Sequence, residues 1–231
     1  MPSQDTTIQA SDGGAIPSYL SLPESGAGVG VVMIASIMGV ASDIRELADK
    51  MAALGFAVSA PDPFWRDDDS GVLEVSEEGR KRAFARMGRV DQGVNMGDLE
   101  TVIADLKGRP QCNGKVAVMG FCFGGSYAFL GAARLGTDAG IAFHSGGISP
   151  FLDEAANINC PLSWHWGDED HAAPPEEIEK VQAAFAGMGG AELYIYPGGK
   201  HGFMQPTNPA AYDEAIRDAS WARAMEVLKG L

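Results

Sequence analysis

The chain has 231 residues, of which 45% are hydrophobic, and carries a formal net charge of −14. A chain of this length can form one large α/β domain with a sizeable core, and we expect a single domain over residues 1–231. The negative charge argues against nucleic acid and anionic membranes as partners. The expected partner is therefore a small molecule, bound by a monomer or a small homo-oligomer.

The cysteine count and the absence of long apolar runs predict where the chain resides. No run approaches the roughly 20 apolar residues that a membrane helix needs. Residues 1–7 are polar and lack the Lys or Arg of a signal peptide. Three cysteines, Cys112, Cys122 and Cys160, cannot all pair within one chain and fit a reducing compartment. We therefore expect a cytoplasmic protein.

Strand and helix patterns alternate along the first half of the chain. Two alternating segments flank a Gly-rich turn and predict an opening β-hairpin over residues 6–22. Continuous apolar runs predict buried strands, whereas apolar residues three or four apart predict helices. The predicted strands are 28–36 and 56–60, the predicted helices are 43–54, 77–88 and 91–107, and residues 64–75 are predicted to form an irregular surface loop.

The same alternation continues to the end of the chain. The predicted strands are 116–119, 140–144, 161–166 and 191–196, and the predicted helices are 127–133, 174–187 and 208–228. This order predicts a mostly parallel sheet with helices on both faces. Ligands bind such sheets beyond the carboxyl ends of the strands, so we expect the functional residues in the loops that follow them.

One strand-to-helix junction has the spacing of a nucleophile elbow. Gly120-Phe121-Cys122-Phe123-Gly124 matches G-x-S-x-G with Cys122 in place of Ser. The glycines let strand and helix approach, and the helix N-terminus favours a thiolate and a developing oxyanion. Cys122 is therefore the candidate nucleophile. The alternative is a buried Cys in an ordinary turn, because Cys is often a small core residue.

A thiol nucleophile needs a general base, and four histidines are available. His201 lies in a Gly-rich loop after the last strand, from which an imidazole can reach the elbow, and it is the preferred candidate. His144 ends a strand and His165 lies inside one, so both are expected to be packed. His171 follows an acidic cluster and is expected to be an exposed loop residue.

The group that orients the base should be an acid between the elbow and the histidine loop. Asp168, Glu169 and Asp170 follow a predicted strand there. The order Cys122, acid, His201 matches the nucleophile–acid–histidine order of α/β-hydrolases. Spacing does not choose among the three acids, and for at least two of them the alternative is a solvated acidic turn.

These segments together resemble the dienelactone hydrolase family, the carboxymethylenebutenolidases. The resemblance implies one α/β-hydrolase domain that hydrolyses a lactone through a Cys–Asp–His triad, without metal or cofactor. It places the acid on Asp170 and the oxyanion donors at the backbone N–H groups of Phe123 and Ile37. The matching segments are residues 120–125, 167–170, 201–203 and 96–100.

The chain departs from the family at the substrate site. The family has a Glu after the 28–36 strand that pairs with the resting thiol, and this chain has Ser36 there. Of the two family arginines that hold a substrate carboxylate, Arg80 matches the first and Gln205 replaces the second. Phe84 stands where the family has a Tyr. Half of the anion clamp is therefore missing, and we expect neutral esters or lactones to be good substrates.

The expected function is hydrolysis of a lactone or carboxylic ester through an acyl-enzyme intermediate. The alternative is a non-catalytic α/β-hydrolase-like protein that binds a ligand or senses thiol oxidation, because the activating Glu is absent. Arg80 also has an alternative: it stands among Lys81, Arg82 and Arg86, so it can belong to a solvated helix face.

Overall fold

The computed structural model describes residues 3–231 and divides them into two compact units. The first unit ends at Val116 and the second begins at Ala117, so the boundary lies inside strand β5 (Cys112–Phe121). The single domain over the whole chain stays a prediction. Among residues 3–231, every helix is too short or too polar to span a lipid bilayer. The cytoplasmic location also stays a prediction.

The first unit begins with the predicted hairpin, and its strands lie in the order β1, β2, β4, β3. β1 and β2 pair antiparallel, β2 pairs antiparallel with β4, and β3 pairs parallel with β4. β3 is the continuous apolar run of the sequence and is almost fully buried, as expected for a central strand. The bounds are β1 Gln4–Gln9, β2 Ala15–Ser21, β3 Gly28–Ile34 and β4 Ala57–Pro61.

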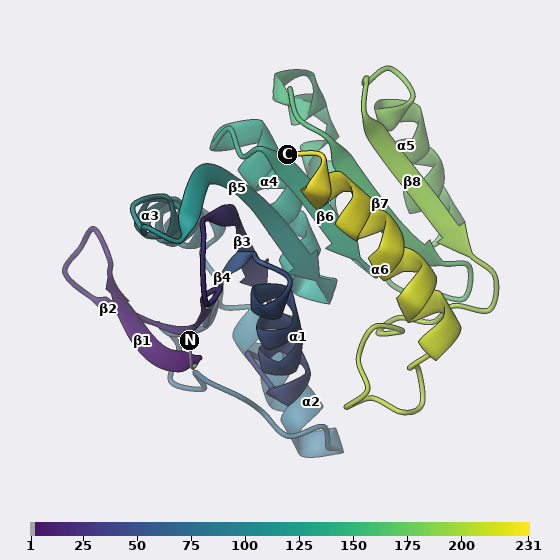
Figure 1. Ribbon diagram of the computed structural model, residues 1–231. Coiled ribbons are helices and arrows are strands. Elements are labelled where there is room, and N and C mark those ends of the chain that lie inside the picture. The colour runs from purple at the N-terminus through teal and green to yellow at the C-terminus, as the bar shows by residue number, and fades with distance from the viewer. Residues whose placement is uncertain (1–2) are drawn as a thin grey trace. The chain divides into compact units, whose positions relative to one another are not determined.

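The helices of the first unit agree with the predicted ranges within two residues. They are α1 (Ser42–Ala53), α2 (Glu77–Met87) and α3 (Gln92–Lys107). Side chains of Ser76 and Asp91 cap α2 and α3 by accepting a hydrogen bond from a backbone N–H of the first turn. α1 packs against β2 and β4, and α3 packs against β3 and β4 (Figure 1).

In the second unit the residues of β5 from Ala117 onward pair parallel with β6, β6 with β7, and β7 with β8. Figure 1 shows α6 crossing the near face of β6 and β7, while α4 lies behind the strands. The bounds are β6 Ala139–Phe143, β7 Leu162–Gly167, β8 Ala191–Tyr196, α4 Gly125–Arg134, α5 Pro175–Phe185 and α6 Glu214–Lys229. Because the strands are parallel, the loops that follow them lie at one edge of the sheet.

The second unit differs from the sequence prediction at its closing helix and at two short 3₁₀ segments. The closing helix was predicted from residue 208 but begins at Glu214, because the Asp213 side chain accepts a hydrogen bond from the Ile216 N–H and so caps it. Residues 209–211 form a turn instead. The 3₁₀ segments η1 (Cys122–Gly124) and η2 (Ser149–Asn157) were not predicted.

Candidate active site

Cys122 is the first residue after β5 and occupies a left-handed backbone conformation with φ of 54°. Positive φ is uncommon for residues other than Gly, and such strain is concentrated at functional sites. η1 begins at Cys122 and α4 follows directly. The strand, sharp turn and helix are therefore arranged as the elbow spacing predicts.

Position 120 has to be Gly, because a side chain there would clash with the backbone of the turn that follows β5. A Cβ atom at this position would lie 2.0 Å from the carbonyl oxygen of Gly124 and 2.3 Å from its carbonyl carbon. Both are backbone atoms, so no side-chain movement can relieve the clash. This confirms that strand and helix approach too closely for any residue larger than Gly.

Cys122, His201 and Asp170 form one chain of hydrogen-bonded side chains. The Nε2 atom of His201 lies 3.0 Å from the Cys122 sulfur, and its Nδ1 atom lies 2.9 and 3.1 Å from the two carboxylate oxygens of Asp170. The Asp170 carboxylate is fully buried and also accepts the Ala172 N–H at 2.8 Å. The His201 ring is thus held between a carboxylate and a thiol.

The structure distinguishes the three acids that spacing left open. Asp168 and Glu169 are exposed, and the Asp168 side chain accepts the backbone N–H of Gly198 rather than a histidine. Asp170 points to His201. The segment that carries Asp170 after β7 and the segment that carries His201 after β8 are in direct backbone contact. A Cβ on Gly167 would lie only 1.9 Å from the carbonyl oxygen of Gly199.

The surroundings of His201 favour its protonated form. Burial opposes the charge, but hydrogen bonds to Asp170 and Cys122, and negative charge on both, outweigh burial and raise the pKa of His201 to about 10. His201 is therefore protonated at neutral pH, and its ring lies between the Asp170 carboxylate and the Cys122 sulfur.

The other histidines lie as the sequence predicts, but two of them also touch His201. His165 is buried, hydrogen-bonds Ser163 and Tyr196, and has its pKa lowered to about 3 by burial. His171 is exposed, with its ring centroid 5.1 Å from that of His201. His144 is fully buried, with its ring centroid 5.2 Å from that of His201. The sequence did not predict either ring contact.

Four predicted site residues lie in the first unit. Ser36 and Ile37 follow β3 and are buried, and the Ser36 hydroxyl accepts the Met38 N–H at 3.3 Å. Arg80 and Phe84 are exposed and lie one turn apart on α2. The roles of Ile37 in an oxyanion hole and of Ser36, Arg80 and Phe84 in substrate binding stay predictions.

The remaining predicted site residues, Phe123 and Gln205, lie in the second unit. Phe123 follows Cys122 in the elbow, and its ring packs against that of Tyr127 with centroids 5.1 Å apart. Gln205 is half-buried and closes the turn that begins at Gly202, directly after His201. Its backbone N–H donates to the Gly202 carbonyl at 2.9 Å.

Arg86, one of the basic residues near Arg80 on α2, does not belong to a solvated helix face. It is fully buried, and its guanidinium donates to the Ile37 carbonyl at 2.6 and 3.1 Å and to two carbonyls of the 64–75 loop. Gly79, Ala83 and Arg86 share the buried face of α2, a spacing that could have revealed it. Arg86 therefore fixes the turn after β3.

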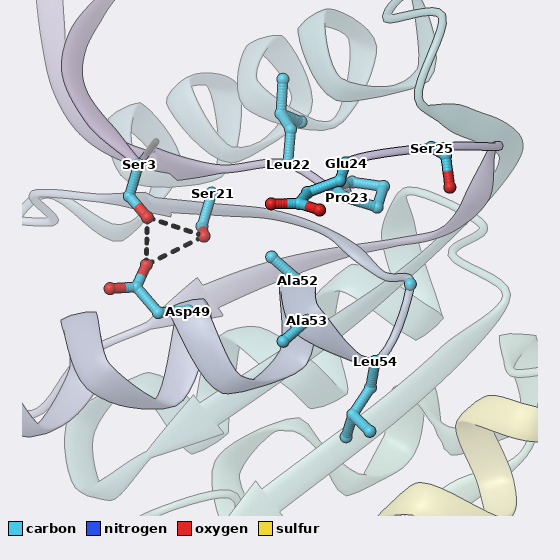
Figure 2. Close-up of a pocket in the computed structure, with 11 residues that line it drawn as sticks. Ser3, Ser21, Leu22, Pro23, Glu24, Ser25, Asp49, Ala52, Ala53 and Leu54 are labelled. Atoms are coloured by element: carbon cyan, nitrogen blue, oxygen red, sulfur yellow. Dashed lines mark hydrogen bonds between the residues drawn. The ribbon is translucent and has the colours of Figure 1, made fainter. Parts of the chain in front are cut away.

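A pocket of about 690 Å³ lies in the first unit, between the end of β2 and the end of α1 (Figure 2). At its side the Asp49 carboxylate accepts hydrogen bonds from the hydroxyls of Ser3, Ser21 and Tyr19. These bonds outweigh the effect of burial and hold the pKa of Asp49 below its ordinary value. The carboxylate is already occupied by hydroxyls that join β2 to α1, which is a structural role.

Comparison with known proteins decides the family. The model of the dienelactone hydrolase family matches residues 16–231. The chain belongs to the dienelactone hydrolase family. It is 31% identical over 232 residues to a carboxymethylenebutenolidase of Pseudomonas sp., covering 99% of this chain and 96% of that protein. It is 30% identical over 229 residues to carboxymethylenebutenolidase 1 of Cupriavidus pinatubonensis, covering 99% and 97%. The family resemblance drawn from the motifs is confirmed, and the protein is an ester or lactone hydrolase.

Solved structures establish the fold of this family member. A dienelactone hydrolase-like promiscuous phosphotriesterase from metagenomic libraries has a TM-score of 0.84 at 22% identity, covering 100% of this chain and 99% of that one. An esterase of Pyrococcus furiosus has a TM-score of 0.71 at 18% identity, covering 99% and 92%. The predicted α/β-hydrolase fold, with a mostly parallel sheet, helices on both faces and an opening hairpin, is confirmed.

We expect Cys122 to react with iodoacetamide much faster than the other two cysteines. Cys112 is buried, and burial raises the pKa of the Cys160 thiol to about 11. Only Cys122 has a histidine within hydrogen-bond distance of its sulfur among the described residues. Peptide mapping by mass spectrometry after a brief exposure measures this, and preferential labelling of Cys112 or Cys160 would contradict an activated Cys122.

Proposed function

We propose that this hydrolase cleaves its lactone or carboxylic ester by covalent catalysis through a Cys122–His201–Asp170 triad. The observation that carries the proposal is the uninterrupted chain of contacts from sulfur to imidazole to carboxylate, at 3.0 and 2.9 Å. The left-handed backbone at Cys122 supports it, because the elbow conformation presents the sulfur at the end of β5.

In the first half-reaction the sulfur of Cys122 attacks the carbonyl carbon of the substrate and forms a C–S bond. The backbone N–H of Phe123, the residue after the nucleophile, is a donor for the oxyanion, and family resemblance supplies Ile37 as the second. The C–O bond of the ester then breaks, and the leaving oxygen takes the proton from Nε2 of His201. In a lactone the leaving alcohol stays attached to the acyl group.

In the second half-reaction His201 acts as the base. Its Nε2 takes a proton from water, the hydroxide attacks the thioester carbon, and the C–S bond breaks to return the thiolate and release the acid. The Asp170 carboxylate holds the proton on Nδ1 and stabilises the imidazolium. The buried position of its carboxylate fits this role, because it strengthens the interaction with His201.

Gln205 stands where the family has an arginine that holds a substrate carboxylate. We propose that this hydrolase therefore accepts neutral esters or lactones at least as well as carboxylate-bearing ones. A charged hydrogen bond contributes roughly 1.5–3 kcal/mol, so Gln205→Arg should raise the preference for a carboxylate-bearing ester over its neutral analogue by about ten- to a hundredfold. Gln205→Glu is the matched control and should shift the ratio the other way. The measurement is kcat/KM for a matched substrate pair. A wild type that prefers the anion several hundredfold, with Gln205→Arg leaving that ratio unchanged, would contradict the proposal.

A hydrolysis screen over lactones and simple esters tests the proposed function as a whole. Each substrate is offered with and without a carboxylate beside the scissile bond, to wild type and to Cys122→Ala. We expect turnover of several neutral members by wild type and none by Cys122→Ala above the rate in buffer. Turnover that survives in Cys122→Ala would show that the reaction does not use this thiol.

A further inference from the structure

His144 has a combination of features that a packed core residue does not need. It directly follows β6 and adopts φ of 38°. In the described part of the chain, His144 and Cys122 are the non-glycine residues that have positive φ. Its N–H donates to the His165 carbonyl at 2.8 Å, so the left-handed turn begins where the β6–β7 ladder ends. The strained conformation is thus built into the same sheet edge that holds the nucleophile.

The turn after His144 is pressed against the elbow helix. A Cβ on Gly125, the first residue of α4, would lie 2.3 Å from the Cβ of Ser145. The backbone therefore has to bend sharply as it leaves β6, and a left-handed residue makes that bend. Asn, Asp and His are the side chains that tolerate this conformation best after Gly.

The side chain of His144 is buried without the hydrogen bonds that normally compensate for burial. It is fully inaccessible, and within residues 3–231 neither ring nitrogen has a hydrogen-bond partner. Burial, together with the charge on nearby His201, lowers the pKa of His144 well below its ordinary value, so the ring is neutral. An unpaired buried imidazole is costly, so it requires a compensating use.

What His144 contacts is the candidate base. Its ring meets the ring of His201 nearly edge-on, with centroids 5.2 Å apart and planes at 73°, and it meets the Phe203 ring at 5.3 Å and 82°. Near-perpendicular contacts of this kind are a preferred arrangement of aromatic rings. His201 is therefore held by a ring contact with buried His144 as well as by its hydrogen bonds to Asp170 and Cys122.

We propose that His144 is a positioning residue, whose ring supports His201 in the plane that joins Asp170 to the Cys122 sulfur. The inference rests on the proposed function, since it assigns His144 a role through the base of that mechanism. It also accounts for the residue type. The position requires a left-handed backbone and an aromatic ring, and of the side chains that tolerate that backbone only His has one.

Four titratable groups face His201 at this contact. Asp170 and Cys122 hydrogen-bond its two nitrogens, and the ring centroids of exposed His171 and buried His144 lie 5.1 and 5.2 Å from that of His201. Loss of the His144 ring lets the imidazole rotate away from the sulfur, which weakens the hydrogen bond between His201 and Cys122. The pH profile of Cys122 alkylation reports this interaction directly and requires no substrate.

The test compares ringless and ring-keeping variants. His144→Asn and His144→Gly both keep the left-handed backbone and remove the ring, and His144→Phe keeps a ring. His165→Asn is the matched control, because it removes a buried neutral histidine one strand away that does not touch His201. Each folded variant, checked by circular dichroism, is alkylated with iodoacetamide from pH 5 to pH 10, and kcat and KM are measured for an aryl ester.

Both ringless variants should slow alkylation of Cys122 at pH 7 by about tenfold or more, and lower kcat to a similar extent with little change in KM, because displacement of about 1 Å at a reacting group costs up to a hundredfold. His144→Phe should stay within about threefold of wild type in alkylation, although it will be less stable. His165→Asn should leave the profile of the folded protein unchanged.

Two results would overturn the role of His144 and leave the proposed function intact. One is a wild-type alkylation profile in both ringless variants, and the other is a loss in His144→Phe as large as in His144→Asn. The second would mean that a ring at this position is not sufficient to support His201. Slow alkylation of Cys122 in the wild type itself is a different failure. It would overturn the proposed function, and with it the role of His144.

Discussion

Replacement of Asp170 by Asn should lower kcat for ester hydrolysis on the order of 10³- to 10⁴-fold while the protein stays folded. Asp170 accepts a hydrogen bond from Nδ1 of His201 at 2.9 Å from a fully buried position. An amide at this place removes the charge that stabilises the imidazolium, and its NH₂ group can donate to Nδ1 and select the wrong tautomer. The measurement is kcat at pH 7 for an activated aryl ester.

Glu169→Gln is the matched control for Asp170→Asn, because it makes the same chemical change at the preceding, exposed residue. It should leave kcat within about twofold of wild type.

Asp170→Asn should also lower the pKa of His201 from about 10, since both the hydrogen bond and the charge of Asp170 raise it. Alkylation of Cys122 at neutral pH should slow accordingly. An Asp170→Asn enzyme within tenfold of wild type would exclude Asp170 as the orienting acid.

Replacement of Gly120 by Ala should disrupt the elbow. The new methyl group would lie 2.0 Å from the carbonyl oxygen of Gly124, so the backbone of β5 or of η1 has to move. Overpacking typically costs about 1–3 kcal/mol and more where the backbone cannot yield, so we expect a loss of at least about 3 kcal/mol in the free energy of unfolding. Displacement of Cys122 should remove both fast alkylation and turnover.

The matched control for Gly120→Ala is Gly97→Ala in the interior of α3, where a Cβ would have no atom within 4 Å. Ala is a better helix former than Gly, so this variant should gain about 0.5–1 kcal/mol. Urea unfolding measures both variants. A Gly120→Ala protein as stable and as active as wild type would mean that the elbow can adopt another backbone conformation.

The sequence predicts the elements of this fold well where local chemistry determines them. The apolar run at residues 116–119, the glycines on either side of Cys122 and the helix that follows are enough to locate the elbow. His201 is recognisable from its Gly-rich loop after the last strand. The choice of Asp170 over Asp168 and Glu169 required family resemblance, because three adjacent carboxylates in one turn differ only in which way the loop directs them.

Residues whose partners are distant in the chain could not be predicted in this way. The contact between His144 and His201 joins loops after β6 and β8, and no local pattern encodes it. Arg86 is a charged residue on a helix rich in charges, and its burial depends on the Ile37 carbonyl that it contacts 49 residues away. The closing helix was predicted six residues too early, because a cap at Asp213 determines where it starts.

Covalent catalysis by this hydrolase requires a bond between the substrate acyl group and Cys122. Rapid mixing with an aryl ester whose bulky acyl group slows the attack of water, followed by an acid quench, intact-mass measurement and peptide mapping, detects that bond. We expect one acyl group per chain, on Cys122, formed in step with the burst of released phenol and lost at the rate of steady turnover. Steady turnover with no adduct at any time, or with the acyl group on another residue, would contradict it.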